Sequence, residues 1–307
     1  MRRATTDPSG DQVTVSVVIP HYGRPEPTLA LATSIAEGAD GHLHEVIVAD
    51  DSSPIPFPRG SEGIRVVRRE VNGGFGAAVN SGAAVATGSH LLILNSDLTL
   101  PPGFVDAMVE RSSGWGEAVT GPAILAPSGA PDYTGRRFPR ISHQVIEWLT
   151  PLARWRGRRW WHRGVGHDVQ ATPGHTVPVD WLVGAALLIP IERFREVGGF
   201  DERFFMNCEE IDLQRRLGQA GVPSVYLGHV SVTHEGGGSS DPLLRRRWLV
   251  GARLTYARKW GGHRRLIAAL MAATGANFVW NLVRRAMGRE TAPVATAREE
   301  VSLITST

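Results

Sequence analysis

The chain has 307 residues, of which 42% are hydrophobic and 21% are charged, so it can bury a large core and is not a disordered protein. Its formal net charge of +3 suits an anionic small ligand or a membrane surface and gives no reason to expect nucleic-acid binding. Cys208 is the only cysteine, which excludes an internal disulfide framework and a cysteine-based zinc site.

The N-terminal residues 1–12 are polar and lack an apolar run, so they predict a flexible tail rather than a secretory signal. No stretch of 18 uniformly apolar residues occurs, and the nearest, Leu266–Val283, is interrupted by polar and small side chains. Together with the single cysteine, these features predict a cytoplasmic protein.

The first hundred residues alternate between apolar runs and helical patterns. Val13–Pro20 is apolar and β-branched, as in a strand that is buried on both faces. Further strands are expected at Glu45–Ala49, Ile64–Arg68 and Leu91–Leu94, and helices at Thr28–Glu37 and Ala77–Ala86. This alternation predicts an α/β fold built from βαβ units.

The remainder of the chain is less regular. Residues 133–176 are rich in Arg, Trp, Gly and His without periodicity, which is typical of a long functional insertion or a mobile loop. Residues 291–307 are interpreted as a second flexible tail. Between residues 176 and 291 we expect an apolar segment at Val179–Pro190, a helix at Phe204–Leu217, a strand at Ser224–Val232 and a basic helical region over 241–290.

Carboxylates follow two of the predicted strands. Asp50 and Asp51 end the second strand, and Asn95-Ser96-Asp97 ends the fourth. Because ligands of open α/β sheets bind outside the carboxyl ends of the strands, these side chains are expected to face one crevice. The aspartates of the second strand could accept hydrogen bonds from a nucleobase or ribose, and Asp97 could hold a hard divalent cation. The alternative is that the two segments, Asp50-Asp51 and Asn95-Ser96-Asp97, are ordinary turns.

A glycine-rich turn, Asn72-Gly73-Gly74-Phe75-Gly76, precedes the second helix and is followed by Asn80-Ser81-Gly82. Glycines let a backbone approach a ligand closely, and a helix N-terminus favours anions. The turn is not a P-loop, because no Gly-Lys-Ser/Thr follows it. An ordinary tight turn that enters a helix is an equally good interpretation.

Three acids lie within four residues at Glu209, Glu210 and Asp212. On a helix, Glu209 and Asp212 share a face, while Glu210 points elsewhere. Acids beside the apolar run that precedes them suit a general base with a shifted pKa, and a surface helix with internal ion pairs is the competing interpretation. His234 follows the last strand and could bind a metal, although a lone histidine is more often structural.

In this order, the motifs resemble those of family 2 glycosyltransferases with the GT-A fold, from about Val15 to Gly238. The resemblance also includes Trp181–Ala186 and the run Gly199-Phe200-Asp201-Glu202. It implies a Rossmann-like, mixed and mostly parallel sheet flanked by helices, with a C-terminal helical extension. The catalytic domain would span 13–240, with a nucleotide-sugar half at 13–100 and an acceptor half at 101–240.

The resemblance also implies a role for each motif. Glu210 is the expected general base. The acceptor is expected to contact Trp181, Gly184 and Glu209. Asp97 and His234 would hold Mg²⁺ or Mn²⁺; the family's first metal-motif aspartate is Asn95 here, so Asp97 would carry that contact alone. Donor binding would involve Pro20, Tyr22, Asp50, Asp51, Asn72, Gly74, Asn80, Asn95, Ser96 and Asp97.

The implied reaction is inverting transfer of a sugar from a nucleotide-diphosphate donor to an acceptor hydroxyl. The subgroup resembles bacterial rhamnosyltransferases that use dTDP-L-rhamnose and act on glycan or polyprenyl-linked sugars in envelope polysaccharide synthesis. The same chemistry with a UDP-hexose or UDP-galactofuranose donor is an alternative. A sugar-phosphate nucleotidyltransferase and a non-catalytic nucleotide-sugar-binding protein are the competing classes.

Two basic segments predict peripheral attachment to the anionic inner face of the plasma membrane. One is the Arg- and Trp-rich run at 154–163. The other is an apolar stripe of Ile267, Met271, Phe278 and Leu282, flanked by arginine pairs at 264–265 and 284–285. A helix that simply packs on the rest of the protein is the alternative.

Overall fold

The computed structural model describes residues 12–38, 40–60, 62–236 and 241–305, so the predicted tail at 1–12 falls, except for Gln12, outside the described residues. The chain forms two compact units. The sheet unit contains the described residues of 12–136, 170–205 and 209–236, and the helical unit contains 137–169, 206–208 and 241–305.

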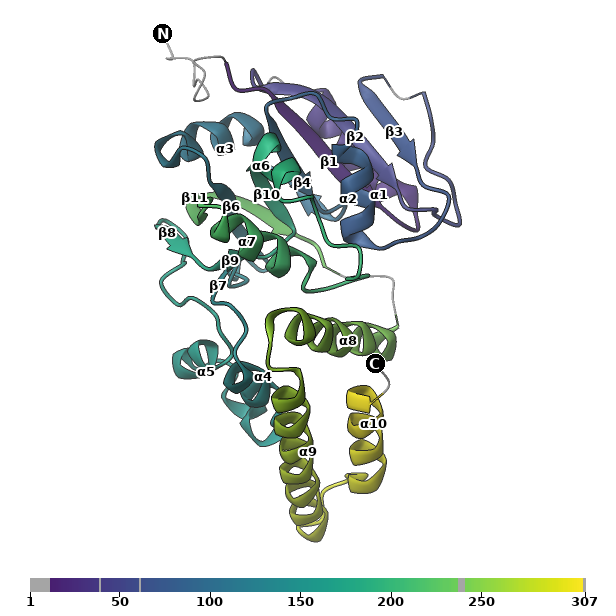
Figure 1. The fold of residues 1–307 in the computed structure, drawn as a ribbon, viewed down its shortest axis with the longest axis vertical. Coiled ribbons are helices and arrows are strands. Elements are labelled where there is room, and N and C mark those ends of the chain that lie inside the picture. Colours follow the sequence, from purple (N-terminus) through teal and green to yellow (C-terminus); the bar gives the residue numbers. More distant parts are fainter. Residues whose placement is uncertain (1–11, 39, 61, 237–240, 306–307) are drawn as a thin grey trace. The chain divides into compact units, whose positions relative to one another are not determined.

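One curved mixed sheet organises the sheet unit (Figure 1). Its strand order is β3-β2-β1-β4-β10-β6-β11-β5, and β8 pairs with β11. The first four strands of this order are parallel, β10 runs antiparallel between β4 and β6, and β11 is parallel to β6. The strands are β1 (Val15–His21), β2 (Leu43–Asp50), β3 (Ile64–Arg68), β4 (His90–Leu94), β5 (Leu98–Thr99), β6 (Val119–Leu125), β8 (Thr176–Val179), β10 (Ala186–Pro190) and β11 (Ser224–His234).

Helices cover both faces of this sheet. Alternating side chains of β1 separate two cores: Val17 and Ile19 pack on one face with α1 and α3, and Val18 packs on the other with α2, α6 and α7. A small two-stranded sheet of β7 (Gly135–Arg136) and β9 (Trp181–Leu182) completes the unit. Its helices are α1 (Pro25–Ala36), α2 (Phe75–Ala83), α3 (Phe104–Ser112), the 3-10 turn η1 (Ser113–Trp115), α6 (Ile191–Glu196) and α7 (Glu209–Gln219).

The α/β prediction and the positions of β1 to β4 are therefore confirmed. The helix expected at Phe204–Leu217 is wrong at its start, because α7 begins at Glu209, after two non-glycine residues with left-handed backbone: φ is 71° at Asn207 and 65° at Cys208. Left-handed geometry cannot continue into a right-handed helix, so it fixes the point at which α7 begins.

The helical unit corrects two further predictions. The segment 133–176 is not one irregular loop, because it contains β7 and the helices α4 (Ile141–Trp148), η2 (Thr150–Trp155) and α5 (Arg159–Gly164). The expected tail at 291–307 forms α10 (Pro293–Thr305), while 306–307 lie outside the described residues. The helices α4 and α10 share a core with α8 (Pro242–Trp260) and α9 (His263–Ala286), and this core includes Trp148, Leu254, Leu270 and Leu303.

Buried polar side chains hold this second core together. Asn277 of α9 donates to the backbone oxygen of Trp148 at 3.0 Å and to Glu300 of α10 at 3.1 Å. The Trp148 indole donates to Thr274 at 2.9 Å. These hydrogen bonds link α9 to α4 and to α10 inside the core.

Candidate active site

The register of β5 against β11 brings the two predicted metal ligands together. His234 pairs with Leu98, the residue after Asp97, and the backbone N–H of Glu235 donates to the Asp97 carbonyl at 3.0 Å. The imidazole Nε2 of His234 lies 3.0 Å from Asp97 Oδ1. This hydrogen bond is the main cause that raises the pKa of His234. Both side chains are partly exposed, so a ligand can reach them.

The acid pair lies at the first turn of α7. Glu209 is buried and Glu210 is partly exposed. The Oε2 atom of each is inaccessible to solvent and accepts no hydrogen bond within the described part of the chain. Burial raises the pKa of both carboxyls, and for Glu209 the adjacent charge of Glu210 raises it further. Both carboxyls therefore resist ionisation more than an exposed glutamate does.

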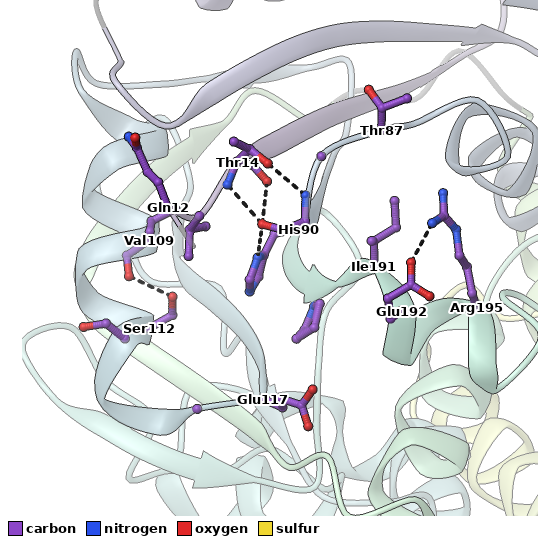
Figure 2. A pocket seen from close by; sticks show the side chains of 16 residues that line it. Gln12, Thr14, Thr87, His90, Val109, Ser112, Glu117, Ile191, Glu192 and Arg195 are labelled. Atoms are coloured by element: carbon purple, nitrogen blue, oxygen red, sulfur yellow. Dashed lines mark hydrogen bonds and ion pairs between the residues drawn. The ribbon is translucent and has the colours of Figure 1, made fainter. Parts of the chain in front are cut away.

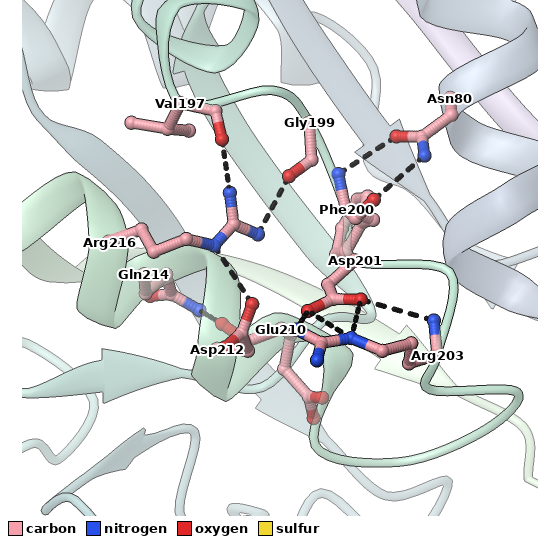
Figure 3. Close-up of polar contacts among 10 residues, drawn as sticks. All are labelled: Asn80, Val197, Gly199, Phe200, Asp201, Arg203, Glu210, Asp212, Gln214 and Arg216. Carbon is pink, nitrogen blue, oxygen red and sulfur yellow. Dashed lines mark hydrogen bonds and ion pairs between the residues drawn. The ribbon is translucent and has the colours of Figure 1, made fainter. Parts of the chain in front are cut away.

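Two contacts fix α7 in place. The side chain of Gln214 accepts from the Leu182 N–H at 2.8 Å and donates to the Leu182 carbonyl at 2.7 Å, which clamps the helix to β9. Asp212 is fully buried and binds Arg216 at 2.9 Å, as the sequence predicted for a structural ion pair. Figure 3 shows Arg216 donating onward to the carbonyls of Val197 and Gly199.

The β9–β10 connection links the acid pair to the metal ligands. The backbone N–H of Asn95 donates to the Ala185 carbonyl at 2.8 Å. A Cβ on the neighbouring Gly184 would lie 3.3 Å from that of Glu210, so this glycine lets the base pack directly against the strand connection. Gly184 thus lies next to Glu210, and its contact with an acceptor stays a prediction.

Charged side chains continue around the same edge. Arg136 lies over the buried Trp181 ring, 5.4 Å from its centroid, and its charge acts on Glu210. Its guanidinium also lies 4.0 Å from Asp132, whose charge acts on His234. Arg136 thus interacts with both Glu210 and Asp132, and the inclusion of the predicted base and metal ligands in one site stays a prediction.

The predicted nucleotide-binding aspartates are held by the protein itself. Asp50 is fully buried, accepts from the backbone of Ser53 and Phe57, and binds Arg68. Asp51 binds Arg69 at 2.9 Å and accepts from the N–H of Gly74 at 2.7 Å. These bonds shape the turns at the ends of β2 and β3, so the turn interpretation is correct for both residues; contact with a donor stays a prediction.

The glycine-rich turn packs against the loop that leads to α7. A Cβ on Gly74, where φ is 87°, would lie 1.8 Å from the Phe205 carbonyl oxygen, so only glycine fits. Asn80 accepts from the Phe200 N–H at 2.8 Å and donates to its carbonyl at 2.9 Å (Figure 3). The turn and Asn80 therefore position the loop that carries the acid pair.

Of the remaining predicted donor residues, Asn72 lies between β3 and α2, and the others lie at or just after the carboxyl ends of β1 and β4. Tyr22 is exposed, while Pro20, Asn72, Asn95 and Ser96 are partly exposed. Sequence reasoning missed Arg136, Asp132 and Gln214. Gln214 bonds to Leu182 across 32 positions, and Arg136 pairs with Trp181 in another strand, so no local pattern marks these residues.

Asp97 and His234 fit a divalent cation as ligands, since carboxylate oxygen suits Mg²⁺ and imidazole nitrogen also suits Mn²⁺. The described residues contain no group of three or more His, Cys, Asp or Glu side chains that could hold a metal ion. A cation held by only two side chains keeps free coordination positions for water and for the oxygens of a diphosphate. Mg²⁺ in phosphate-binding sites is commonly held in this way.

A separate cavity of about 610 Å³ opens at the opposite edge of the sheet (Figure 2). It is lined by the starts of β1 and β4 and by α6, with Thr14, His90, Glu192 and Arg195 among its residues. None of the predicted site residues contributes to it. Ligands of open α/β sheets bind at the carboxyl edge, so we assign the chemistry to the Asp97 and Glu210 side.

The fold and this site define a sugar-nucleotide-dependent transferase class, and the comparisons identify the family. Residues 16–172 match the model described as Glycosyl transferase family 2. The chain is 30% identical over 235 residues to N-acetylglucosaminyl-diphospho-decaprenol L-rhamnosyltransferase of Mycobacterium tuberculosis, across 70% of this chain and 72% of that protein. The chain belongs to glycosyltransferase family 2 and is a rhamnosyltransferase-like enzyme, which removes the nucleotidyltransferase and non-catalytic alternatives.

Two further comparisons agree. O-antigen biosynthesis protein RfbC of Myxococcus xanthus is 27% identical over 230 residues, which cover 72% of this chain and 17% of that protein. The solved structure of mannosyltransferase PcManGT from Pyrobaculum calidifontis, in complex with GDP-Man and Mn²⁺, aligns with a TM-score of 0.53 at 15% identity, over 98% of this chain and 87% of that one. This likeness confirms the GT-A fold.

The raised pKa of Glu209 predicts a pH-dependent stability. A group whose pKa is raised by folding contributes stability below its unfolded pKa, and this contribution is lost as the pH rises through the folded value. We expect Glu209→Gln to raise the Tm at pH 8 by roughly 2–4 °C, on the order of 1 kcal/mol, because no buried charge then forms. The gain in Tm should be smaller at pH 5. An equal gain at both pH values would contradict a raised pKa of Glu209.

Proposed function

We propose that the enzyme transfers a sugar, with inversion, from a nucleotide-diphosphate donor to a hydroxyl of a glycan or lipid-linked acceptor. The observation that carries the proposal is the Asp97–His234 pair, and it is supported by the buried Oε2 atom of Glu210, which accepts no hydrogen bond within the described residues. A cation ligand pair and a base with a raised pKa are the groups that such a displacement requires.

In this proposal, Glu210 accepts the proton of the acceptor hydroxyl as its oxygen bonds to the anomeric carbon. The bond from that carbon to the diphosphate breaks, and the electron pair leaves with the nucleotide. A cation held by Asp97 and His234 would neutralise charge on that leaving group. Glu210 is suited to the task because its raised pKa makes it a stronger base than an exposed glutamate.

The proposed donor is dTDP-L-rhamnose, supported by the relative that is named as an L-rhamnosyltransferase. That relative's name also specifies a decaprenyl-diphosphate-linked acceptor, so a polyprenyl-linked sugar is the proposed acceptor class here. A panel of dTDP-, UDP- and GDP-sugars, read out as released nucleoside diphosphate with added Mg²⁺ or Mn²⁺, tests the donor. Release from UDP-galactofuranose or a UDP-hexose alone would replace rhamnose in this proposal.

We further propose a cytoplasmic enzyme that attaches to the anionic inner leaflet through α9. By length and composition this helix could cross a membrane, with 33% of its most apolar window buried. The predicted stripe is partly wrong, because Ile267 and Met271 pack against the helical core. The exposed apolar side chains are instead Val279, Leu282, Val283 and Met287, next to Arg284 and Arg285.

This surface predicts binding to anionic vesicles. Each arginine near an anionic leaflet contributes about 1 kcal/mol, so Arg284→Gln with Arg285→Gln should weaken binding roughly 30-fold. The measurement is co-sedimentation at low salt with vesicles of phosphatidylcholine, with and without phosphatidylglycerol. Arg65→Gln with Arg111→Gln, two exposed arginines of the sheet unit, is the charge-matched control. Wild-type protein that ignores anionic vesicles would end the proposal.

A further inference from the structure

The cavity at the opposite edge of the sheet from Asp97 takes no part in the proposed transfer reaction (Figure 2). Four segments of the sheet unit line it: the approach to β1, the approach to β4, the end of α3 with η1, and the start of α6. Its volume of about 610 Å³ lies within the range of small-molecule sites. Since none of the proposed catalytic or donor-binding residues lines it, the cavity is available to a separate ligand.

The floor of the cavity is polar and is held by hydrogen bonds between the approaches to β1 and β4. The N–H of Thr14 donates to Ser89 Oγ at 3.0 Å, and the N–H of Ser89 donates to Thr14 Oγ1 at 3.0 Å. The Nδ1 atom of His90 lies 3.1 Å from the same Ser89 hydroxyl. A Cβ on Gly88 would lie 2.8 Å from the Ser16 nitrogen, so the approach to β4 packs directly on β1. The floor is therefore preformed.

The charges around the cavity are balanced. Glu117 Oε2 accepts from Nε of Arg193 at 2.9 Å and from a terminal nitrogen of the same side chain at 2.6 Å. Glu192 pairs with Arg195 at 2.7 Å, and Figure 2 shows this pair at the wall that α6 forms. Each lining carboxylate thus has an arginine partner, so the cavity presents no excess charge that would attract an anion or a cation. This balance favours a neutral ligand.

Hydrogen-bond acceptors predominate on the wall between α3 and β6. Both bonds from Arg193 go to one oxygen of Glu117, so Oε1 remains able to accept from a ligand. The hydroxyl of Ser112 donates to the Val109 carbonyl at 2.9 Å, and that of Ser113 donates to the carbonyl three residues before it at 2.8 Å. A hydroxyl that has used its one proton offers only lone pairs to a ligand. The wall therefore favours a ligand that brings several O–H or N–H donors.

We propose that this cavity is a second, non-catalytic binding site whose ligand is a sugar unit of a neutral glycan. A saccharide carries several hydroxyl donors and no charge, which matches both the acceptor-rich wall and the balanced charges. Trp115, between the lining residues Ser113 and Gly116, is 38% exposed and offers aromatic surface for the apolar face of a sugar ring. The site lies away from the proposed transfer edge, so it holds a glycan on the enzyme without entering the reaction.

A matched pair of substitutions tests the site. Glu117→Gln and Glu196→Gln each remove one carboxylate partner of Arg193, but only Glu117 lines the cavity. Methyl glycosides of L-rhamnose, N-acetyl-D-glucosamine and D-galactose are titrated into ¹⁵N-labelled protein, with glycerol and putrescine as polyol and cation controls. Amide signals of residues 112–117 report this cavity, and those of residues 95–98 report the transfer site. We expect a glycoside to shift the signals of 112–117, with an affinity about tenfold lower in Glu117→Gln and unchanged in Glu196→Gln.

Ser112→Ala is a second variant that leaves the ion pairs intact, and it should weaken binding about threefold. Circular dichroism of each variant verifies that the fold persists. The inference would be overturned by three results: no shift at 112–117 with any glycoside, an equal loss in Glu117→Gln and Glu196→Gln, or equally large shifts with glycerol or putrescine. Shifts confined to residues 95–98 would place the sugar at the transfer site and overturn it as well. If the enzyme transfers no sugar from any donor while 112–117 still respond, the proposed function is refuted and the second site stands.

Discussion

Replacement of Glu210 by glutamine is expected to reduce turnover roughly 10²- to 10⁴-fold, which is the typical contribution of a general base. Glutamine keeps the size and packing of the side chain against Gly184 but cannot accept the proton of the acceptor hydroxyl. Donor affinity, measured by calorimetry, should be nearly unchanged, because the proposed donor contacts do not include Glu210. A loss of turnover without a loss of donor affinity is the expected signature.

Two neighbours provide the controls for this result. Asp212→Asn removes a buried ion pair with Arg216 and should lower thermal stability more than it lowers turnover per folded molecule. Glu209→Gln should leave the base in place. Near-normal turnover in Glu210→Gln, with collapse in Glu209→Gln or Asp212→Asn, would move the catalytic role to that residue.

The pH dependence of turnover follows from the same carboxyl. A base works only when ionised, and burial raises the pKa of Glu210 above that of an exposed glutamate. Turnover should therefore rise with pH through this raised pKa, and the acid limb should disappear in Glu210→Gln.

Removal of the metal is expected to abolish transfer, since a cation at a diphosphate leaving group contributes several kcal/mol and each 1.36 kcal/mol is a factor of ten in rate. EDTA should stop the reaction, and Mg²⁺ or Mn²⁺ should restore it. Asp97→Ala should lose on the order of 10³-fold in turnover while its fold persists, because the Asp97 side chain is partly exposed and contributes little to the core.

Replacement of His234 tests whether this residue binds the metal or only supports the fold. His234→Ala removes the hydrogen bond to Asp97 and one proposed ligand, so we expect a higher metal concentration for half-maximal activity. Losses of about 10- to 100-fold in metal affinity are typical of changes around such sites. Full activity of the wild-type enzyme in chelator would refute the cofactor proposal, whatever the variants do.

The sequence by itself determined the fold class and the positions of the motifs. Buried parallel strands are continuous apolar runs, so β1 to β4 could be found without a structure, and the polar residues that follow them mark the carboxyl edge. The acid pair could be located in the same way, since three acids beside an apolar run are conspicuous in any sequence. Such local patterns carry information because a strand or a helix end is defined by a few consecutive residues.

Only the tertiary structure decided how these motifs are used. His234 meets Asp97 through pairing of β11 with β5, across 137 positions, and Arg136 meets Trp181 through pairing of β7 with β9. Asp50 and Asn80 are committed to internal bonds that no local pattern reveals. The helices α4 and α10 were missed because their apolar side chains pack with those of α8 and α9 in one core. Their stability comes from tertiary packing of distant segments rather than from propensity, so a short window of sequence does not contain it.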